Sequence, residues 1–403
     1  MRRRGGHLTR RRLIGATVFS IMGRKGLGSP AGSCAGRRLP PERREFRDDR
    51  TDTVLWQMTA APSMHHHFYF TNPSWPDDQR ELYFISYRGG YPNIFAATAH
   101  DGSITQLTDR PDINPFSPAA TRDGERIYFS ARDAVIELDR ATLRERTLAT
   151  FGGARLGNCS LNPRGSRLAI GVRSETSCRL ALVDVESGKP QFLIEKKEVG
   201  HVQFCPADDS ILEYSGPPGA RIWTIRADGT GDRNLYPQRP DEWIVHESWL
   251  GDGSEIIFTR WPHALCAVSR DGASVRTIAE FNAWHACGDR SGAKIIADTN
   301  HPDIGLQLIN AQTGGRKTLC WPGATNRGTQ WRLATPARGA GIDTSIIRGE
   351  HPEQDRPPKP EDPPSVYGPQ WTHPHPSFSP DGHSVVFTSD RGGWSHVYVA
   401  DSG

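Results

Sequence analysis

Histidine recurs at a regular interval in the second half of this chain, and the regularity indicates a shared site. Seven polar residues occupy the same place relative to a repeated turn motif: Asn72, Ser117, Asn158, His201, His246, His285 and His375. Subtracting their numbers gives steps of 45, 41, 43, 45 and 39 residues, followed by one of 90. Gln370 and His373 lie close to His375, and imidazole nitrogens and amide oxygens bind divalent transition metals. The pattern predicts a metal site; the alternative is a polar channel whose histidines bond to backbone and water.

A strand-turn-strand pattern follows each of these seven positions. Pro380-Asp381-Gly382 leads into an alternating strand at 384–388, and Arg122-Asp123-Gly124 leads into Ile127-Tyr128-Phe129. Each copy predicts a hairpin, and many copies continue into a second strand pair that ends near an Asp-Gly or Ser-Gly turn. Four strands in roughly 40 to 45 residues are typical of a propeller blade. The sequence therefore predicts an all-β fold, a seven-bladed β-propeller whose inner strands bring the seven polar residues to one channel mouth.

The two ends of the chain predict how the ring closes. The last strand pattern, Val397-Tyr398-Val399-Ala400, leaves the seventh blade incomplete, while residues 54–59 resemble an outer strand that precedes the first blade. We expect this N-terminal strand to complete the last blade. The propeller is assigned to residues 46–403, with a loop insertion at 321–369 that is rich in proline and has no strand pattern of its own.

The charge of the chain is unevenly distributed. The formal net charge is +3, but residues 1–50 contain 14 basic and 4 acidic residues, a balance of +10, so the remainder carries −7. This remainder has no general basic surface, and we find no nucleic-acid-binding motif, so a nucleic-acid partner is not expected.

Residues 1–36 resemble an export leader. Arg10-Arg11-Arg12 precedes a short apolar run at 13–23, an arrangement that suits the twin-arginine route. The run is too short for a convincing transmembrane span, so no stable span is expected in the mature form. The expected location is the periplasm; a cytoplasmic protein with an unstructured leader is the alternative.

These residues together resemble the oligogalacturonate lyases, which are seven-bladed propellers that use a Mn²⁺-type divalent metal. The resemblance rests on the Gln370-x-x-His373-x-His375 motif, on His285 and His246 of the preceding blades, and on Arg221. It implies a metal held by His285, Gln370, His373 and His375. His373 and His375 are two residues apart, so on an extended strand both side chains would point to one side.

The same resemblance implies roles for the other polar residues. His246 would be the base that removes the proton on C5 of a uronate, and Arg221 would clamp a substrate carboxylate, with a structural ion pair as its alternative. The channel-lining residues of the saccharide subsites would be His201, His65, His66, His67 and Asn72.

The resulting hypothesis is a metal-dependent lyase that cleaves short uronic-acid oligosaccharides, oligogalacturonate above all, by β-elimination. Two alternatives stay open. One is a lyase or epimerase that acts on another uronate-containing saccharide, because the insertion at 321–369 and the leader depart from the family pattern. The other is a non-catalytic periplasmic binding propeller.

Overall fold

The computed structural model describes residues 33–299, 302–325 and 372–403 of the chain. Two compact units separate between Ser33 and Cys34, and the fold belongs to the second unit, Cys34–Gly403. Most of the predicted leader (1–32), most of the predicted insertion (326–369) and the predicted metal ligand Gln370 lie outside the described residues. Export to the periplasm therefore stays a prediction, which cell fractionation would test. Within the described ranges, no helix is long and apolar enough to cross a membrane.

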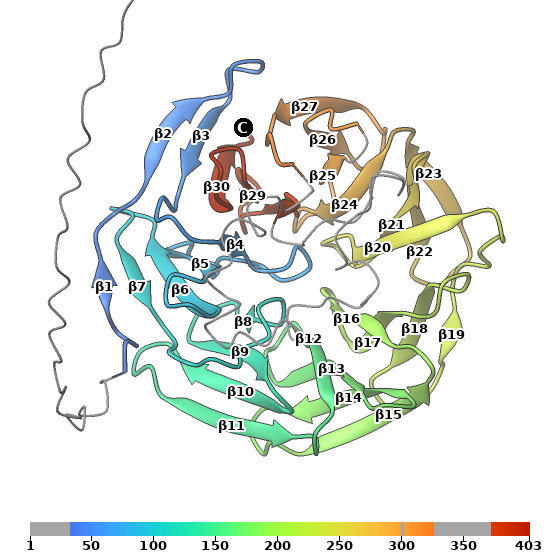
Figure 1. The fold of residues 1–403 in the computed structure, drawn as a ribbon. Helices are drawn as coiled ribbons and strands as arrows, with labels where there is room; N and C mark the ends of the chain where they lie inside the picture. The colour runs from blue at the N-terminus through green and yellow to red at the C-terminus, as the bar shows by residue number, and fades with distance from the viewer. Residues whose placement is uncertain (1–32, 300–301, 326–371) are drawn as a thin grey trace, which may run out of the picture. The chain divides into compact units, whose positions relative to one another are not determined.

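Seven antiparallel sheets stand around a ring in the order of the chain (Figure 1). The seven-bladed propeller predicted from the repeats is thereby confirmed. Blades 1 to 3 comprise β1(Arg38–Leu39), β4(His65–His67), β5(Glu81–Ser86), β6(Asn93–Thr98) and β7(Ile104–Gln106); β8(Ala119–Ala120), β9(Arg126–Ala131), β10(Ala134–Asp139) and β11(Glu145–Thr150); and β12(Arg155–Leu161), β13(Arg167–Arg173), β14(Cys178–Asp184) and β15(Pro190–Lys196).

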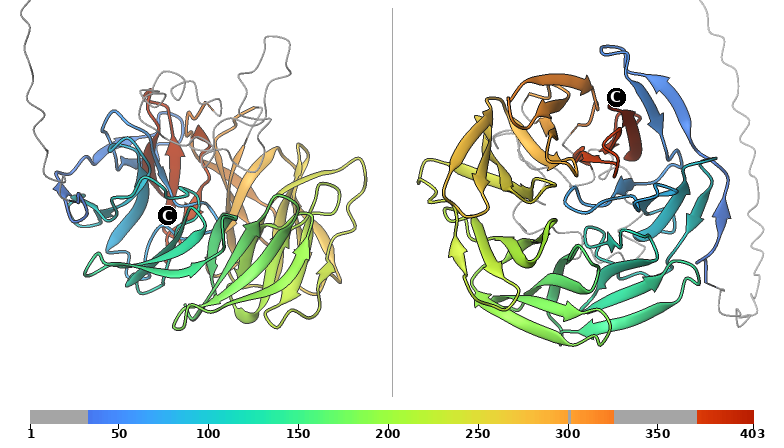
Figure 2. Two further views of the ribbon diagram at one scale, coloured as in Figure 1. Left: turned by 60° about the horizontal axis from the view of Figure 1, so that its bottom comes forward. Right: turned by 180° about the vertical axis from the view of Figure 1, so that it is seen from behind.

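Blades 4 to 7 comprise β16(Gly200–Cys205), β17(Asp208–Ser215), β18(Ile222–Arg226) and β19(Arg233–Asn234); β20(Trp243–Trp249), β21(Glu255–Trp261), β22(Ala264–Ser269) and β23(Val275–Ala279); β24(Ala283–Gly288), β25(Lys294–Thr299), β26(Leu306–Asn310) and β27(Arg316–Cys320); and β28(Ser377–Phe378), β29(Ser384–Ser389) and β30(His396–Asp401) with β3(Val54–Gln57) and β2(Arg44–Arg47) from the N-terminal side. In these four blades the innermost strands are β16, β20, β24 and β28; Figure 2 shows the ring tilted by 60° and from behind.

The ring closes through β3, as the ends of the sequence predicted. This strand runs antiparallel to β30, with Leu55 opposite Ala400, and β2 pairs with its outer side. The fold also starts earlier than the predicted boundary at residue 46, since β2 begins at Arg44 and β1 adds an outer strand to blade 1. Blade 7 is thus made from both ends of the described chain, and blade 1 also takes its outermost strand from the N-terminal segment.

The repeated turn owes its glycine to a left-handed backbone. Gly382 and Gly124 have φ of 73° and 70°, a conformation that glycine adopts without steric cost. A Cβ at Gly124 would also lie 2.8 Å from the Cβ of Pro76 in blade 1, so this turn needs glycine for packing as well. In the last copy, Ser379 Oγ and the backbone N of His383 both donate to the Asp381 carboxylate. Local hydrogen bonds therefore explain why the turn could be recognised in the sequence.

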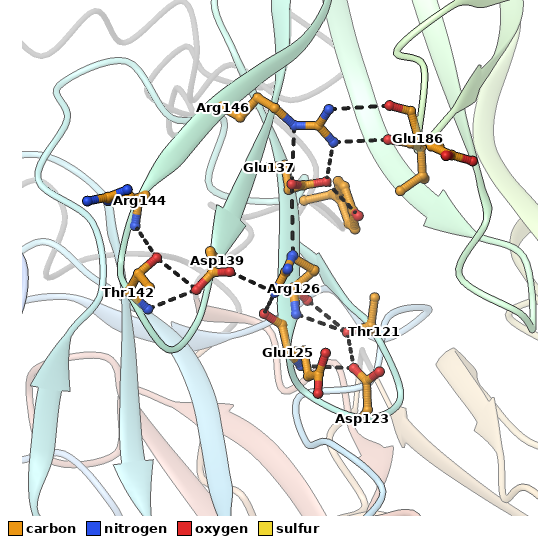
Figure 3. A network of polar contacts seen from close by, with 12 residues as sticks. Thr121, Asp123, Glu125, Arg126, Glu137, Asp139, Thr142, Arg144, Arg146 and Glu186 are labelled. Atoms are coloured by element: carbon orange, nitrogen blue, oxygen red, sulfur yellow. Dashed lines mark hydrogen bonds and ion pairs between the residues drawn. The ribbon is translucent and has the colours of Figure 1, made fainter.

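Neighbouring blades are joined by apolar packing inside and by polar contacts at the rim. One core cluster joins Tyr83 and Ile85 of β5 to Phe129 of β9, all fully buried. Further out, Arg146 of β11 bonds to Glu137 of β10 at 2.8 Å and reaches the next blade at the backbone carbonyl oxygen of Glu186, 3.4 Å away (Figure 3). The blades thus hold the inner strands, and the residues they carry, in fixed relative positions.

Candidate metal centre and active site

Three of the predicted metal ligands converge at the inner edge of blades 6 and 7. One nitrogen each from His285, His373 and His375 lies within 4.8 Å of the others. The ring centroids of His285 and His375 are 3.9 Å apart, and the rings of His373 and His375 stack at 5.7 Å. All three side chains are buried. The structure therefore brings together residues from two blades at one point that can hold a metal ion.

The backbone departs from regular strand geometry where these histidines lie. In β24 the register with β25 shifts between Ala283 and Ala286, on either side of His285, and β12, β16 and β20 contain a shift at the corresponding place. A bulge of this kind turns a side chain toward a new direction. His201, His246 and His375 also have positive φ, at 43°, 56° and 47°. The expectation that His373 and His375 share an extended strand is wrong, because the left-handed backbone of His375 bends this segment.

Asp298 of β25 holds two of the histidine segments together, and the sequence analysis missed it. Its carboxylate accepts bonds from Nδ1 of His285 at 2.9 Å, from the backbone N of His285 at 2.7 Å and from the backbone N of His375 at 3.1 Å. Carboxylates that bond to a metal-binding histidine in this way set its tautomer and orientation. The only signal in the sequence is an acid at the end of the apolar run Ile295-Ile296-Ala297.

The unpaired ring nitrogens of His285 and His375 fit a metal ion. Because Nδ1 of His285 donates to Asp298, its Nε2 carries a lone pair, and this buried atom has no hydrogen-bond partner among the described residues; the same is true of Nε2 of His375. Buried polar atoms rarely lack a hydrogen-bond partner. Burial also lowers the pKa of both histidines well below the usual value, so both are neutral ligands, and burial raises the pKa of Asp298 to about 7.

His246 lies beside this cluster on the inner strand of blade 5. Its ring centroid is 4.1 Å from that of His285, and its Nδ1 donates to the carbonyl oxygen of Trp284 at 2.9 Å. Since a carbonyl can only accept, the lone pair is on Nε2. Burial, followed by the proximity of His285 and His201, lowers the pKa of His246 well below 6.5. The side chain is therefore neutral at neutral pH and able to take up a proton.

Two aromatic residues that the sequence analysis missed fill the space between the histidines. Tyr69 and Phe70 lie in the segment after β4, which reaches toward the middle of the ring (Figure 1). The Phe70 ring stacks 6.0 Å from that of His375 and lies 5.3 Å from that of His285. Tyr69 contacts His375 and brings its hydroxyl within 3.4 Å of Nε2 of His201. These rings form an apolar wall that keeps the cluster away from bulk water.

Arg221 and His201 lie on blade 4, facing the strand that carries His246. Arg221 makes a two-pronged ion pair with Glu247, through Nε at 2.8 Å and Nη2 at 3.0 Å. Nδ1 of His201 lies 3.8 Å from the same carboxylate. The structural ion pair that the sequence left open for Arg221 is therefore present, and the predicted clamp would have to use the Nη1 side of the guanidinium.

The other predicted subsite residues contact residues of blades 2, 3 and 7. His65 stacks on His396 at 5.3 Å, and His66 stacks on Phe116 at 4.8 Å. Nε2 of His67 lies 3.2 Å from the carbonyl oxygen of Pro374, so this ring supports the segment between His373 and His375. The amide nitrogen of Asn72 donates to the carbonyl oxygens of Pro118 and Cys159, at 3.0 Å each. A role of these four residues in binding saccharide stays a prediction.

Fold and site together define a seven-bladed propeller with a buried histidine cluster beside a neutral histidine. No family model matches the chain. The chain is 24% identical over 401 residues to the oligogalacturonide lyase of Pectobacterium atrosepticum, with 91% of this chain and 97% of the relative covered. It is 22% identical to the oligogalacturonate lyase of Dickeya dadantii, over the same shares of the two chains. The resemblance to oligogalacturonate lyases noted in the sequence thus extends over nine tenths of the chain.

Solved structures support the same fold. An oligogalacturonate lyase in complex with manganese superposes with a TM-score of 0.75 at 20% identity, covering 91% of this chain and 98% of the other. The oligogalacturonate lyase of Vibrio parahaemolyticus gives the same TM-score and identity, with 92% and 99% covered. At this identity the likeness establishes the architecture of the propeller.

Proposed function

We propose that this protein is a metal-dependent lyase that cleaves oligogalacturonate by β-elimination. The observation that carries the proposal is the cluster of His285, His373 and His375 with the neutral His246 ring 4.1 Å from that of His285. The similarity to oligogalacturonate lyases along nine tenths of the chain supports the choice of substrate. The cluster supplies imidazole donors, and the resemblance adds Gln370 as a further ligand.

A bound divalent metal, which the manganese-containing relative suggests is Mn²⁺, would act as a Lewis acid that neutralises charge on the uronate carboxylate. The protein's own contribution is to keep His285 and His375 neutral by burial, to fix the ring of His285 and the backbone of His375 through Asp298, and to cover the cluster with Tyr69 and Phe70. These interactions are in place before substrate binds, which is the condition under which electrostatic stabilisation is effective.

His246 would carry out the proton transfer. Its Nδ1 bond to Trp284 leaves Nε2 to take the proton from C5 of the uronate. The electrons of the C5–H bond then form the C4=C5 double bond, while the C4–O4 bond breaks and its electron pair leaves with O4, which takes a proton from water. His246 returns its proton to solvent afterwards. Arg221 would bind the carboxylate of the sugar as a charged hydrogen-bond donor.

Replacement of His246 provides the first test. In the His246→Ala variant we expect kcat on oligogalacturonate to fall by roughly 10² to 10⁴, the usual contribution of a general base. The assay is the absorbance of the unsaturated uronate, with mass analysis of the products because a keto rearrangement removes that absorbance. The metal content should stay at the wild-type level, whereas His285→Ala should lose metal.

Several outcomes would change the proposal. Full activity in the His246→Ala variant would remove this residue as the base. Activity of the wild-type protein on another uronate would keep the mechanism and change the substrate. Binding of saccharide without any product by mass analysis would favour the non-catalytic propeller.

A further inference from the structure

One buried carboxylate connects Arg221 and His201 to the strand of the proposed base. Glu247 accepts bonds from Nε and Nη2 of Arg221 at 2.8 and 3.0 Å and from Oγ of Ser215 at 2.8 Å. Ser215 Oγ in turn lies 3.3 Å from Nδ1 of His201. The Glu247 side chain is fully buried. A single glutamate therefore organises two polar side chains of blade 4.

Glu247 belongs to a different blade from the residues that it contacts. Glu247 follows His246 directly on β20 of blade 5, whereas Ser215 ends β17 of blade 4 and Arg221 precedes β18. The carboxylate thus spans the junction between the two blades. Any shift of blade 4 relative to β20 would break the ion pair, so Arg221 is held at a set distance from the strand that carries His246.

A second buried glutamate in the same network, Glu213, is protonated, whereas Glu247 is ionised. Burial alone would raise the pKa of Glu247, but Arg221 and then His201 lower it well below the usual range, so it is ionised. For Glu213 of β17, burial and the charge of Glu247 raise the pKa well above the usual range, so it is protonated. Gln203 joins the two, since its Nε2 donates to Glu213 Oε2 and to the backbone oxygen of Glu247, at 2.9 Å each. Of these two glutamates, Glu247 is the one that provides a negative charge for Arg221.

We propose that Glu247 is a positioning residue that fixes the plane of the Arg221 guanidinium, and the ring of His201, for recognition of an acidic sugar ring next to His246. This inference rests on the proposed function. A two-pronged bond to the Nε and Nη2 edge removes rotation about the end of the arginine side chain, so a substrate carboxylate meets a donor that is already oriented. The orientation is obtained without binding energy from the substrate, which is the benefit of a preorganised site.

Two matched substitutions test the proposal. Glu247→Gln and Glu213→Gln each change one buried glutamate of the same network with almost no change in size. We expect Glu247→Gln to lower kcat/KM on oligogalacturonate on the order of 100-fold, mainly through KM, because misplaced recognition groups have effects of this size. Metal content should not change. Glu213→Gln should behave like the wild type, because glutamine resembles the protonated acid. Equal losses in the two variants would overturn the proposal.

A double variant separates positioning from a general loss of structure. If Glu247 acts mainly through Arg221, the Arg221→Gln/Glu247→Gln protein should lose far less activity than the two single losses combined, because groups that act as a unit are not additive. The double variant also removes both charges of the ion pair, so it leaves no unpaired charge between the two blades. If the loss of activity in the double variant equals the two single losses combined, Glu247 does not act through Arg221.

Chemical labelling keeps this test independent of the proposed activity. If the wild-type protein is inactive on every uronate, the proposed function fails, but phenylglyoxal modification followed by peptide mass mapping still reports on Arg221. We expect slow labelling of Arg221 in the wild type and in Glu213→Gln, and clearly faster labelling in Glu247→Gln. Equal labelling rates in the three proteins would show that Glu247 does not hold the guanidinium.

Discussion

At the scale of single residues, the site depends on side chains that hold other side chains. Asp298 orients the ring of His285 and bonds to the backbone of His375, and Glu247 orients Arg221 and lies beside His201. Both carboxylates are buried, and each bonds to a group on a neighbouring strand or blade. Such supporting groups matter because an imidazole that can rotate loses the preorganisation that binding and catalysis require.

Asp298 gives a prediction for metal binding. In Asp298→Asn the carboxamide has about the same size, but one of the two accepting oxygens becomes an NH2 donor, so the bonds that fix His285 and the backbone of His375 cannot all form and metal affinity should fall by roughly 10- to 100-fold. Titration calorimetry with Mn²⁺ measures this directly, without reference to activity. Asp303→Asn, a nearby acid that does not contact the three histidines in the described structure, serves as the control. Unchanged affinity in Asp298→Asn would show that the carboxylate does not support the metal site.

At the scale of elements, the inner strands carry the site and β3 closes the ring. The inner strands of blades 3 to 6 all contain a register shift at the corresponding place. In each of them this irregularity directs one side chain toward the channel. The closing strand has a different function. It supplies the side chain of Leu55 to a core that also contains Phe387, Tyr398 and Ile296.

Leu55 tests the role of the closing strand in stability. Its side chain is fully buried, so Leu55→Ala should lower the free energy of unfolding by about 3 kcal/mol, within the range of buried leucine truncations. Val54→Ala, one residue away on the same strand but only half-buried, should have a smaller effect. Chemical denaturation monitored by tryptophan fluorescence gives both values. Similar losses in the two variants would show that β3 is not packed as a core strand in solution.

At the scale of the whole molecule, buried neutral histidines make the stability of the ring dependent on pH. Burial lowers the pKa of His66 to about 3 and that of His67 and His396 to about 4, against 6.5 in the unfolded chain. Between these values the unfolded state binds more protons than the folded state. The free energy of unfolding therefore decreases as the pH falls from 6.5 toward 4.

This dependence can be measured from the midpoint of thermal unfolding. We expect the midpoint to be highest above pH 6.5 and to decrease steadily toward pH 4, each histidine adding a slope of up to about 1.4 kcal/mol per pH unit. His66→Phe, which keeps a ring against Phe116, should reduce the slope. A midpoint that does not change between pH 6.5 and 4.5, or a slope unaffected by His66→Phe, would contradict this assignment.

The sequence by itself determined the architecture and the ring closure. Turn glycines such as Gly382 and the apolar alternation after them reflect local backbone requirements, so the repeat could be read without a structure. The last strand pattern left the seventh blade without an outer strand, and the apolar pattern at Val54–Gln57 predicted the strand that completes it. The register of the histidines followed from that repeat, and the structure brings His285, His373 and His375 together, with His246 beside them.

Only the tertiary structure decided which groups support the site. Asp298 meets His375 across 77 residues, and Tyr69 meets His201 across 132. The Arg221 pair with Glu247 crosses from one blade to the next. These contacts depend on how the blades curve around the ring and on bulges that turn the backbone of the inner strands. No local pattern encodes them, because the free energy that selects them comes from burial and charge pairing between segments distant in sequence.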